Sequence, residues 1–284
     1  MKKHILLTTT CIAACAIALL HGCKKETADT DIYAALDNSV ADASFSDLQS
    51  VVNQQAAANG FAGFTASATY GKIADDCPTT TFSEPLGTFP NTMTIDFGTG
   101  CTSYLGINRS GKVMATFTGP YATAGTVITI TTDNYYVNGN KVEGTKTVTN
   151  SGLNDAGNIV FDIIVTDGLI TLATGETISW DAARTREWVE GAGTPEIEDD
   201  AYLISDGTGA DYAASGINRN GTPFTAHIAE PLRKELDCLW ITSGVLEVTP
   251  DGLLTRSLDY GDGACDDQAT LTIGGWSSDI TLPY

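Results

Sequence analysis

The stretch Ile159-Val160-Phe161-Asp162-Ile163-Ile164-Val165 decides the fold class, because its side chains alternate between two faces. The odd-numbered positions are all apolar, and Asp162 lies among the even-numbered ones. Residues 112–117 (KVMATF) show the same alternation, with apolar side chains at every second position. A period of two is typical of a β-strand and not of a helix.

Short glycine-containing segments separate the alternating stretches. They are Arg109-Ser110-Gly111, Asn138-Gly139, Asp155-Ala156-Gly157, Asp167-Gly168, Thr174-Gly175, Asn220-Gly221, Asp251-Gly252 and Gly274-Gly275. Such segments supply the positive φ that tight hairpin turns require, so consecutive strands are expected to be antiparallel neighbours. Residues 61–284 are therefore predicted to form a mainly-β, antiparallel domain, either a β-sandwich or a curved β-meander of hairpins.

Two of these turns resemble each other, which raises the question of two lobes. Gly106-Ile107-Asn108-Arg109-Ser110-Gly111 is similar to Gly216-Ile217-Asn218-Arg219-Asn220-Gly221. The acidic stretch 191–200, which carries proline and glycine, is the candidate boundary. The order of turn and cysteine differs between the halves, so recurring turn chemistry is favoured over a duplication.

Residues 32–60 have a different texture and predict one N-terminal helix. Apolar side chains recur at roughly helical spacing up to Ala58, and Gly60 is the expected end. A break is expected at Ser44-Phe45-Ser46-Asp47, with Ser46 as the N-cap of a second segment. Packing on a sheet is favoured over a role as a partner-binding helix.

The N-terminus indicates export. Met1-Lys2-Lys3 precedes an apolar run that is too short to span a bilayer and ends at Leu20-His21-Gly22-Cys23. These features resemble the signal peptide and lipobox of bacterial lipoproteins. The resemblance implies that residues 1–22 are removed, that Cys23 is lipidated, and that residues 23–31 form a polar tether.

The charge balance excludes some partners. Removal of residues 1–22 reduces the 15 Lys and Arg to 13 and leaves the 35 Asp and Glu, a net charge of about −22. Such a field repels phosphate, so nucleic acid and anionic membrane surfaces are not expected partners. Membrane attachment is expected through the lipid alone.

Four of the seven cysteines remain after processing, namely Cys77, Cys101, Cys238 and Cys265. An even number in an exported chain predicts two disulfide bonds. Asp96-Phe97-Gly98-Thr99-Gly100-Cys101 resembles Asp259-Tyr260-Gly261-Asp262-Gly263-Ala264-Cys265, and each follows another cysteine at a similar spacing. The expected pairs are Cys77 with Cys101 and Cys238 with Cys265.

Catalytic motifs are sparse. His227 is the single histidine of the mature chain, and no Gly-x-Ser-x-Gly elbow or glycine-rich phosphate loop occurs. No catalytic residue is assigned. A glycan hydrolase that uses two carboxylates stays open as an alternative, because acids such as Glu187 and Glu190 are abundant.

Two further candidate sites come from residue clusters. Asp259, Asp262, Asp266 and Asp267 surround a glycine-rich turn and could ligate calcium, with turn capping as the simpler interpretation. Tyr135, Tyr136 and Trp188 could stack on sugar rings, with core packing as the alternative.

From the lipobox to the two Gly-rich cysteine loops, the chain resembles uncharacterised β-rich lipoproteins of the Bacteroidota. That resemblance implies an outer-membrane lipoprotein and carries no activity; the periplasmic and cell-surface faces stay open. We therefore expect a non-catalytic binding or structural module with a glycan or an envelope protein as partner. The alternatives are the glycan hydrolase and a subunit of an outer-membrane complex.

Overall fold

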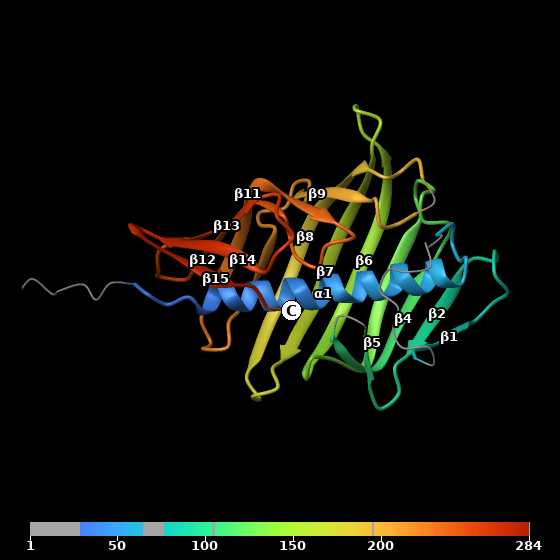
Figure 1. Cartoon of the computed structure of the whole chain (residues 1–284), viewed down its shortest axis with the longest axis horizontal. Helices are drawn as coiled ribbons and strands as arrows, with labels where there is room; N and C mark the ends of the chain where they lie inside the picture. Colours follow the sequence, from blue (N-terminus) through green and yellow to red (C-terminus); the bar gives the residue numbers. More distant parts are fainter. Residues whose placement is uncertain (1–28, 65–76, 104–105, 195, 284) are drawn as a thin grey trace, which may run out of the picture.

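The computed structural model describes residues 29–64, 77–103, 106–194 and 196–283, which form one helix and one large antiparallel sheet (Figure 1). The helix α1 spans Tyr33–Ala58. The strands are β1 (Thr79–Phe82), β2 (Asn91–Asp96), β3 (Cys101–Thr102), β4 (Asn108–Phe117), β5 (Val127–Val137), β6 (Asn140–Leu153), β7 (Ile159–Thr171), β8 (Thr177–Glu190), β9 (Ala201–Asp206), β10 (Ala214–Ile217), β11 (Pro223–Glu235), β12 (Ser243–Pro250), β13 (Arg256–Asp262), β14 (Gln268–Ile273) and β15 (Trp276–Thr281). The predicted mainly-β class is confirmed.

The strands follow each other in the 15-stranded sheet almost in chain order, β1-β2-β4-β5-β6-β7-β8-β10-β11-β12-β13-β14-β15. β3 pairs with β4, and β9 pairs with β8 and β11. Asn138 and Gly139 between β5 and β6 have φ of 49° and 85°, as a type I′ hairpin turn requires. Of the two predicted architectures, the meander of hairpins is the one formed. The sheet continues past residues 191–200, because β8 pairs with β9 across them.

The sheet bends around α1, which lies lengthwise across one face and contacts β2, β4–β8 and β12 (Figure 1). Register shifts interrupt the β4–β5, β6–β7 and β7–β8 pairings, and such bulges bend strands. Gly168 lies at one of them. A Cβ there would lie 2.0 Å from the Trp180 carbonyl oxygen and 3.1 Å from the Phe45 ring, so only glycine admits this approach of β8 and α1.

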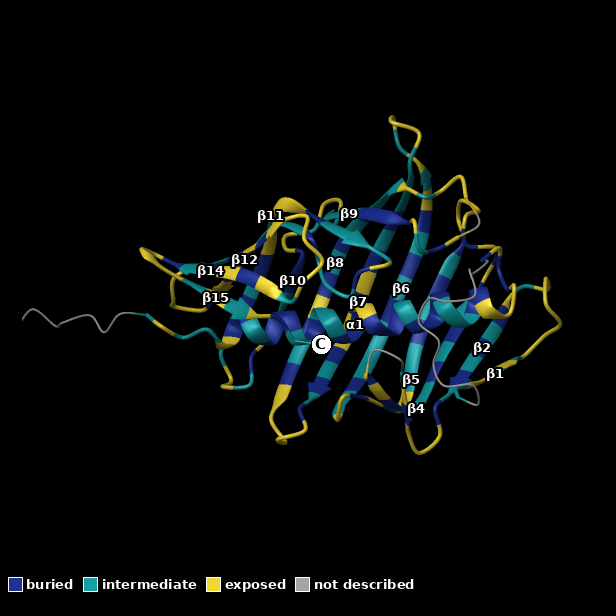
Figure 2. Cartoon of the chain, viewed as in Figure 1, coloured by how far each residue is buried: buried dark blue, intermediate teal, exposed yellow. Residues whose placement is uncertain are grey.

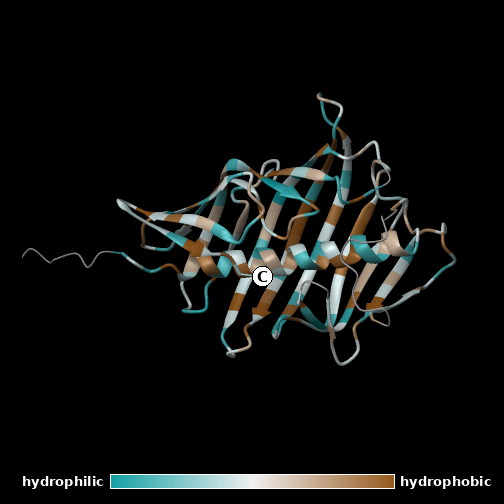
Figure 3. Cartoon of the chain, viewed as in Figure 1, coloured by the Kyte–Doolittle hydropathy of each residue, from teal (hydrophilic) through white to brown (hydrophobic). Residues whose placement is uncertain are grey.

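The core lies between α1 and the inner face of the sheet. Phe161, Ile163 and Val165 of β7 are buried there, whereas Ile164 between them is 48% exposed. Most of α1 is buried, and apolar bands mark the strands behind it (Figures 2 and 3). The alternation of residues 159–165 thus has its predicted structural basis.

The helix is continuous, so the predicted break at 44–47 is wrong. The Ser44 hydroxyl donates to the Val40 carbonyl oxygen one turn earlier. The Asp47 carboxylate accepts hydrogen bonds from Arg109 Nε on β4 at 3.0 and 3.1 Å. The Ser44 hydroxyl bonds back to a carbonyl oxygen of the same helix, and the Asp47 carboxylate is engaged by Arg109 of the sheet, so the helix continues through both residues.

The helix ends at the predicted glycine. Gly60 has a φ of +60°, and the Phe61 N–H bonds to the Ala56 carbonyl oxygen. This six-to-one hydrogen bond is the Schellman arrangement that terminates helices.

Polar side chains connect α1 to the sheet along its length. The contacts are Asp37 with Arg219, Asn38 with Trp180, Asp42 with Arg184, and Asp47 with Arg109 and Tyr135. Packing on the sheet, the favoured interpretation, is therefore the arrangement found.

Residues 29–31 also contact the sheet. Buried Arg256 of β13 donates from Nε to the Asp31 carbonyl oxygen (2.9 Å) and from Nη2 to the Asp29 carboxylate (2.6 Å). A buried cation therefore holds the last three residues of the predicted tether over 23–31 against the sheet. Cys23 and the signal segment 1–22 lie outside the described residues.

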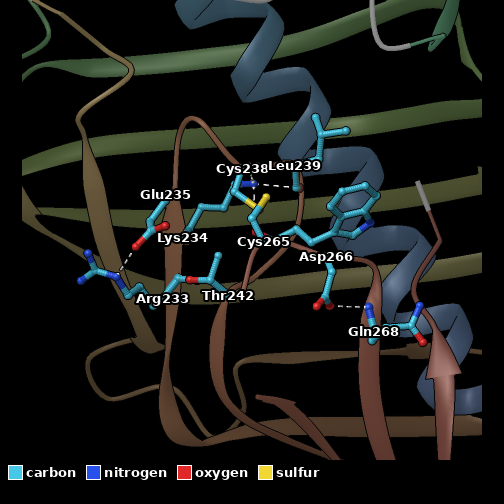
Figure 4. The surroundings of a disulfide bond; sticks show 10 residues. Arg233, Lys234, Glu235, Cys238, Leu239, Thr242, Cys265, Asp266 and Gln268 are labelled. Atoms are coloured by element: carbon cyan, nitrogen blue, oxygen red, sulfur yellow. Dashed lines mark hydrogen bonds and ion pairs between the residues drawn. A yellow bond between two sulfur atoms is a disulfide. The ribbon is translucent and has the colours of Figure 1, made fainter. Parts of the chain in front are cut away.

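The cysteines lie in the predicted pairs. The Cα atoms of Cys77 and Cys101 are 6.2 Å apart, and those of Cys238 and Cys265 are 5.7 Å apart. The second disulfide joins the β11–β12 connection to the β13–β14 connection (Figure 4).

Candidate functional site

An internal cavity of about 120 Å³ lies between α1 and the inner face of the sheet. The side of α1 from Asp42 to Gln54 forms one wall, and residues of β6, β7 and β8 form the other. Leu236, Leu239 and Ile241 of the β11–β12 connection also line it. Two of its lining side chains are small, Ala43 on α1 and Ala182 on β8.

The cavity is unusually cationic for so acidic a chain. Among its described lining side chains, five are basic (Arg109, Lys146, Arg184, Arg186 and Lys234) and two are acidic (Asp42 and Asp47). Buried charges are costly unless they are paired, so an excess of one sign calls for an explanation.

Two of the cations have carboxylate partners on α1. Arg109 holds both carboxylate oxygens of Asp47, and Oδ2 also accepts from the Tyr135 hydroxyl at 2.6 Å. Arg184 donates from Nη1 to Asp42 at 2.8 Å and stacks near Trp180, 5.3 Å from the ring centroid. These pairs account for both acids of the cavity.

Lys146 of β6 forms no ion pair with a carboxylate among the described residues. Its ammonium donates to the Phe45 carbonyl oxygen at 2.9 Å. Burial, together with the positive charges of Arg186 and Arg184 and against the attraction of Asp42, lowers the pKa of Lys146 to about 7.

Arg186 lies in an aromatic cage. Its guanidinium carbon is 5.2 Å from the Phe161 ring centroid and 4.5 Å from that of Tyr202, and Nη2 donates to the Tyr121 hydroxyl at 2.7 Å. Cation–π contacts of this kind stabilise a desolvated guanidinium without a counter-charge. Burial raises the pKa of the Tyr121 and Tyr202 hydroxyls, so both stay neutral.

Unpartnered donors remain on both arginines of β8. Nε and Nη2 of Arg184 and Nε of Arg186 are buried and have no hydrogen-bond partner among the described residues. The residues themselves are only 5% and 6% exposed. Buried donors without acceptors are uncommon in folded proteins and often mark functional positions.

Lys234 organises the connection that closes the cavity. Its ammonium donates to the carbonyl oxygens of Cys238 (2.5 Å), Leu239 (2.7 Å) and Trp240 (3.4 Å) (Figure 4). Burial lowers the pKa of Lys234 to about 8. The Cys238–Cys265 disulfide fixes the same turn to the neighbouring connection.

The predicted stacking residues do not share one surface. Tyr135 is fully buried on the inner face, whereas Tyr136 is 37% exposed on the opposite face. Trp188 is partly buried and packs with Tyr202, 5.6 Å between ring centroids, and its Nε1 donates to Asp200. Adjacent strand residues point to opposite faces, which separates the two tyrosines.

Of the four aspartates predicted as calcium ligands, Asp259 and Asp266 cap turns. Asp259 accepts from the Gly261 N–H, Asp266 from the Gln268 N–H, and Asp267 from the Gln268 side chain. Asp262 lines the shallow depression beside Asp259 and Asp266. Within the described ranges no three Asp, Glu, His or Cys side chains gather as a metal site.

Two basic residues on the apolar face of β8 could have indicated the cavity from the sequence. Arg184 and Arg186 share the even-numbered phase of Ile178, Trp180 and Ala182, so β8 carries two cations on its apolar face. A strand that changes from apolar to cationic on its buried side indicates an internal polar site.

No family model, curated protein or solved structure matches this chain. In the described part of the chain, no helix combines the length and the apolar character needed to cross a bilayer.

Proposed function

We propose that this chain is a lipid-anchored binding module of the bacterial outer membrane that holds a small molecule between α1 and the sheet. The observation that carries the proposal is the cavity lined by buried, partly unpartnered Arg184 and Arg186. The lipobox around Cys23 supports the anchoring and the localisation. A concave internal site with a few convergent polar groups is the usual form of a small-molecule site.

The competing glycan hydrolase has one observation in its favour. Burial raises the pKa of Asp200 to about 7, a value suited to a general acid, and its carboxylate contacts Trp188. However, Asp200 is 4% exposed and is not among the cavity-lining residues, so its carboxyl does not meet the space available to a substrate. The binding module therefore has the stronger support.

The complex-subunit alternative is favoured by the sheet edges. β1 and β15 end the strand order, and each has a single paired neighbour among the described strands. An edge strand offers unpaired backbone groups to a partner chain. This role is compatible with a ligand cavity at the centre of the sheet.

A cavity-filling variant tests the binding function. The mature lipoprotein, extracted from membranes, is compared with Ala182→Phe by native mass spectrometry and by melting in the presence of small carboxylates, phosphates and amides. We expect bound mass or ligand-induced stabilisation in the wild type and its loss in a folded Ala182→Phe protein. Identical behaviour of both proteins with every compound would refute a ligand in this cavity.

A further inference from the structure

We propose that the cavity binds a small amphiphilic anion, with its carboxylate or phosphate head at Arg184, Arg186 and Lys146 and its apolar body beside β7 and the β11–β12 connection. This inference rests on the proposed binding function and specifies its ligand class.

The free edge of Arg184 has the chemistry of an anion site. Nη1 is taken by Asp42, and the unpartnered Nε and Nη2 form the side of the guanidinium that grips a carboxylate with two parallel hydrogen bonds. The same molecule shows this grip once already, because Arg109 holds Asp47 through Nε and Nη2. Arg109 uses Nε and Nη2 to bind an aspartate of the same chain. In Arg184 the same two nitrogens are left for the carboxylate or phosphate of a ligand.

Two more cations converge on the same place. Arg186 follows Arg184 on the same face of β8 and keeps an unpartnered Nε. Lys146 lies two strands away on that face, and both arginines lower its pKa by repulsion, which places the three charges within electrostatic reach. A bound anion would relieve this repulsion and accept the unused hydrogen bonds.

The cavity is also lined by aliphatic side chains, which would contact an apolar part of the ligand. Ile163, Val165, Leu236, Leu239 and Ile241 supply aliphatic surface to the cavity. Its volume of about 120 Å³ is close to the ~150 Å³ of an apolar cavity that holds benzene. An inorganic anion would leave this surface unfilled, and a hydrocarbon would leave the cations unpaired.

Internal acids do not replace the ligand. The buried carboxylate oxygens of Glu198 have no hydrogen-bond partner in the described part of the chain, but Glu198 does not line the cavity. Asp200 is near enough to influence Arg186, but it does not line the cavity either, and its carboxylate accepts a hydrogen bond from Trp188 Nε1. The cationic excess at the cavity surface therefore remains for a diffusible anion.

The first arm of the test varies the ligand. The full mature lipoprotein in lipid nanodiscs is titrated calorimetrically with hexanoate, butyl phosphate, hexanamide and inorganic phosphate, and empty nanodiscs serve as the blank. We expect hexanoate or butyl phosphate to bind at least about tenfold more tightly than hexanamide, because only the anions pair the guanidinium groups. The relative affinities of hexanoate and butyl phosphate identify the head group, and both should exceed inorganic phosphate.

The second arm varies the protein. Arg184→Lys keeps the charge next to Asp42 but loses the two-nitrogen edge, so anion affinity should fall about tenfold. Lys146→Met should lower the affinity for hexanoate and butyl phosphate and leave the affinity for hexanamide unchanged. Arg219→Lys is the matched control, because Arg219 makes an equivalent pair with Asp37 of α1 without lining the cavity. Melting curves confirm that each variant is folded.

The experiments distinguish failure of the anion site from failure of the binding function of the cavity. If hexanamide binds as tightly as hexanoate, or if Arg184→Lys and Lys146→Met both bind anions as the wild type does, the anion site is wrong and the binding cavity stands. If none of the four compounds binds, the anion site is overturned. If, in addition, Ala182→Phe matches the wild type in the native mass measurement, the binding function fails as well.

Discussion

Three aspartates of one helix each meet an arginine: Asp37 meets Arg219 of the β10–β11 turn, Asp42 meets Arg184 of β8, and Asp47 meets Arg109 of β4. They are five positions apart, so each is rotated by about 140° from the previous one around the helix axis. No single face of α1 could present all three to a flat surface. The charges thus match a helix that the sheet surrounds.

The Asp47–Arg109 pair gives the first prediction, at the scale of single residues. Asp47→Ala should lower the free energy of unfolding by about 3–5 kcal/mol, because it leaves a buried guanidinium without its carboxylate. Urea unfolding of the folded variant measures the loss. Asp96→Ala, which removes an exposed partner of Lys112, should change little. If both substitutions lower the free energy of unfolding equally, burial does not strengthen the contribution of the Asp47–Arg109 pair to stability.

Lys146 gives the second prediction. Its folded-state pKa of about 7 lies below the ordinary value of 10.5, so between these values the folded protein binds fewer protons than the unfolded chain. The penalty for the buried ammonium is complete below about pH 7 and fades as the pH rises. Arg184 and Arg186 add to the penalty, and Asp42 opposes it.

Urea unfolding from about pH 6 to about pH 9 checks this sign. The stability of the ligand-free wild type relative to Lys146→Met should increase with pH. Lys112→Met removes an exposed ammonium and is the control that should show no such trend near neutrality. If the difference in unfolding free energy between the wild type and Lys146→Met stays constant or falls as the pH rises, the pKa of Lys146 is not lowered by burial.

At the scale of elements, local sequence was sufficient for what depends on local chemistry. The strand at 159–165, the Asn138-Gly139 turn and the helix end at Gly60 follow from side-chain period and from residues that accept positive φ. The break at 44–47 was wrong because Asp47 has a partner 62 positions away in the chain. The cavity was missed for the same reason, since it depends on which strand positions face α1.

The β11–β12 connection gives the third prediction, because it closes the cavity through one disulfide and one buried ammonium. Opening the Cys238–Cys265 link by replacing both residues with serine should cost about 3–4 kcal/mol, the loop-closure value for a sequence separation of 27 residues. The same variant should weaken ligand binding, since Leu239 and Ile241 lose part of their support. Denaturant unfolding and ligand titration measure the two effects.

The Cys77–Cys101 pair is the control for this variant, because its loop is of similar length and lies at the β1–β4 end of the sheet. Its double serine variant should lose similar stability and keep the ligand affinity. If both variants bind with wild-type affinity, the β11–β12 connection does not shape the cavity.

At the scale of the whole molecule, the charges are segregated. The surface carries most of the acids that give the chain its net charge of −20, while the interior gathers Lys146, Arg184 and Arg186. An acidic exterior repels an anionic membrane surface, so it gives the folded domain no electrostatic affinity for lipid head groups. A diffusing anion is repelled as well until it reaches the cavity, which predicts faster association at higher salt.

Because the surface of the folded domain is acidic, we predict that the protein attaches to the membrane through its lipid alone. Cys23→Ala should move the protein from the membrane fraction to the soluble fraction, because it removes the proposed site of lipidation and the acidic surface opposes adsorption to an anionic membrane. Fractionation and immunoblotting measure the distribution, and labelling with palmitate shows the acyl chain in the wild type. Asp29→Asn is the control, since it alters the contact with Arg256 but spares the lipobox. A Cys23→Ala protein that stays membrane-bound as the wild type does would place the anchor elsewhere.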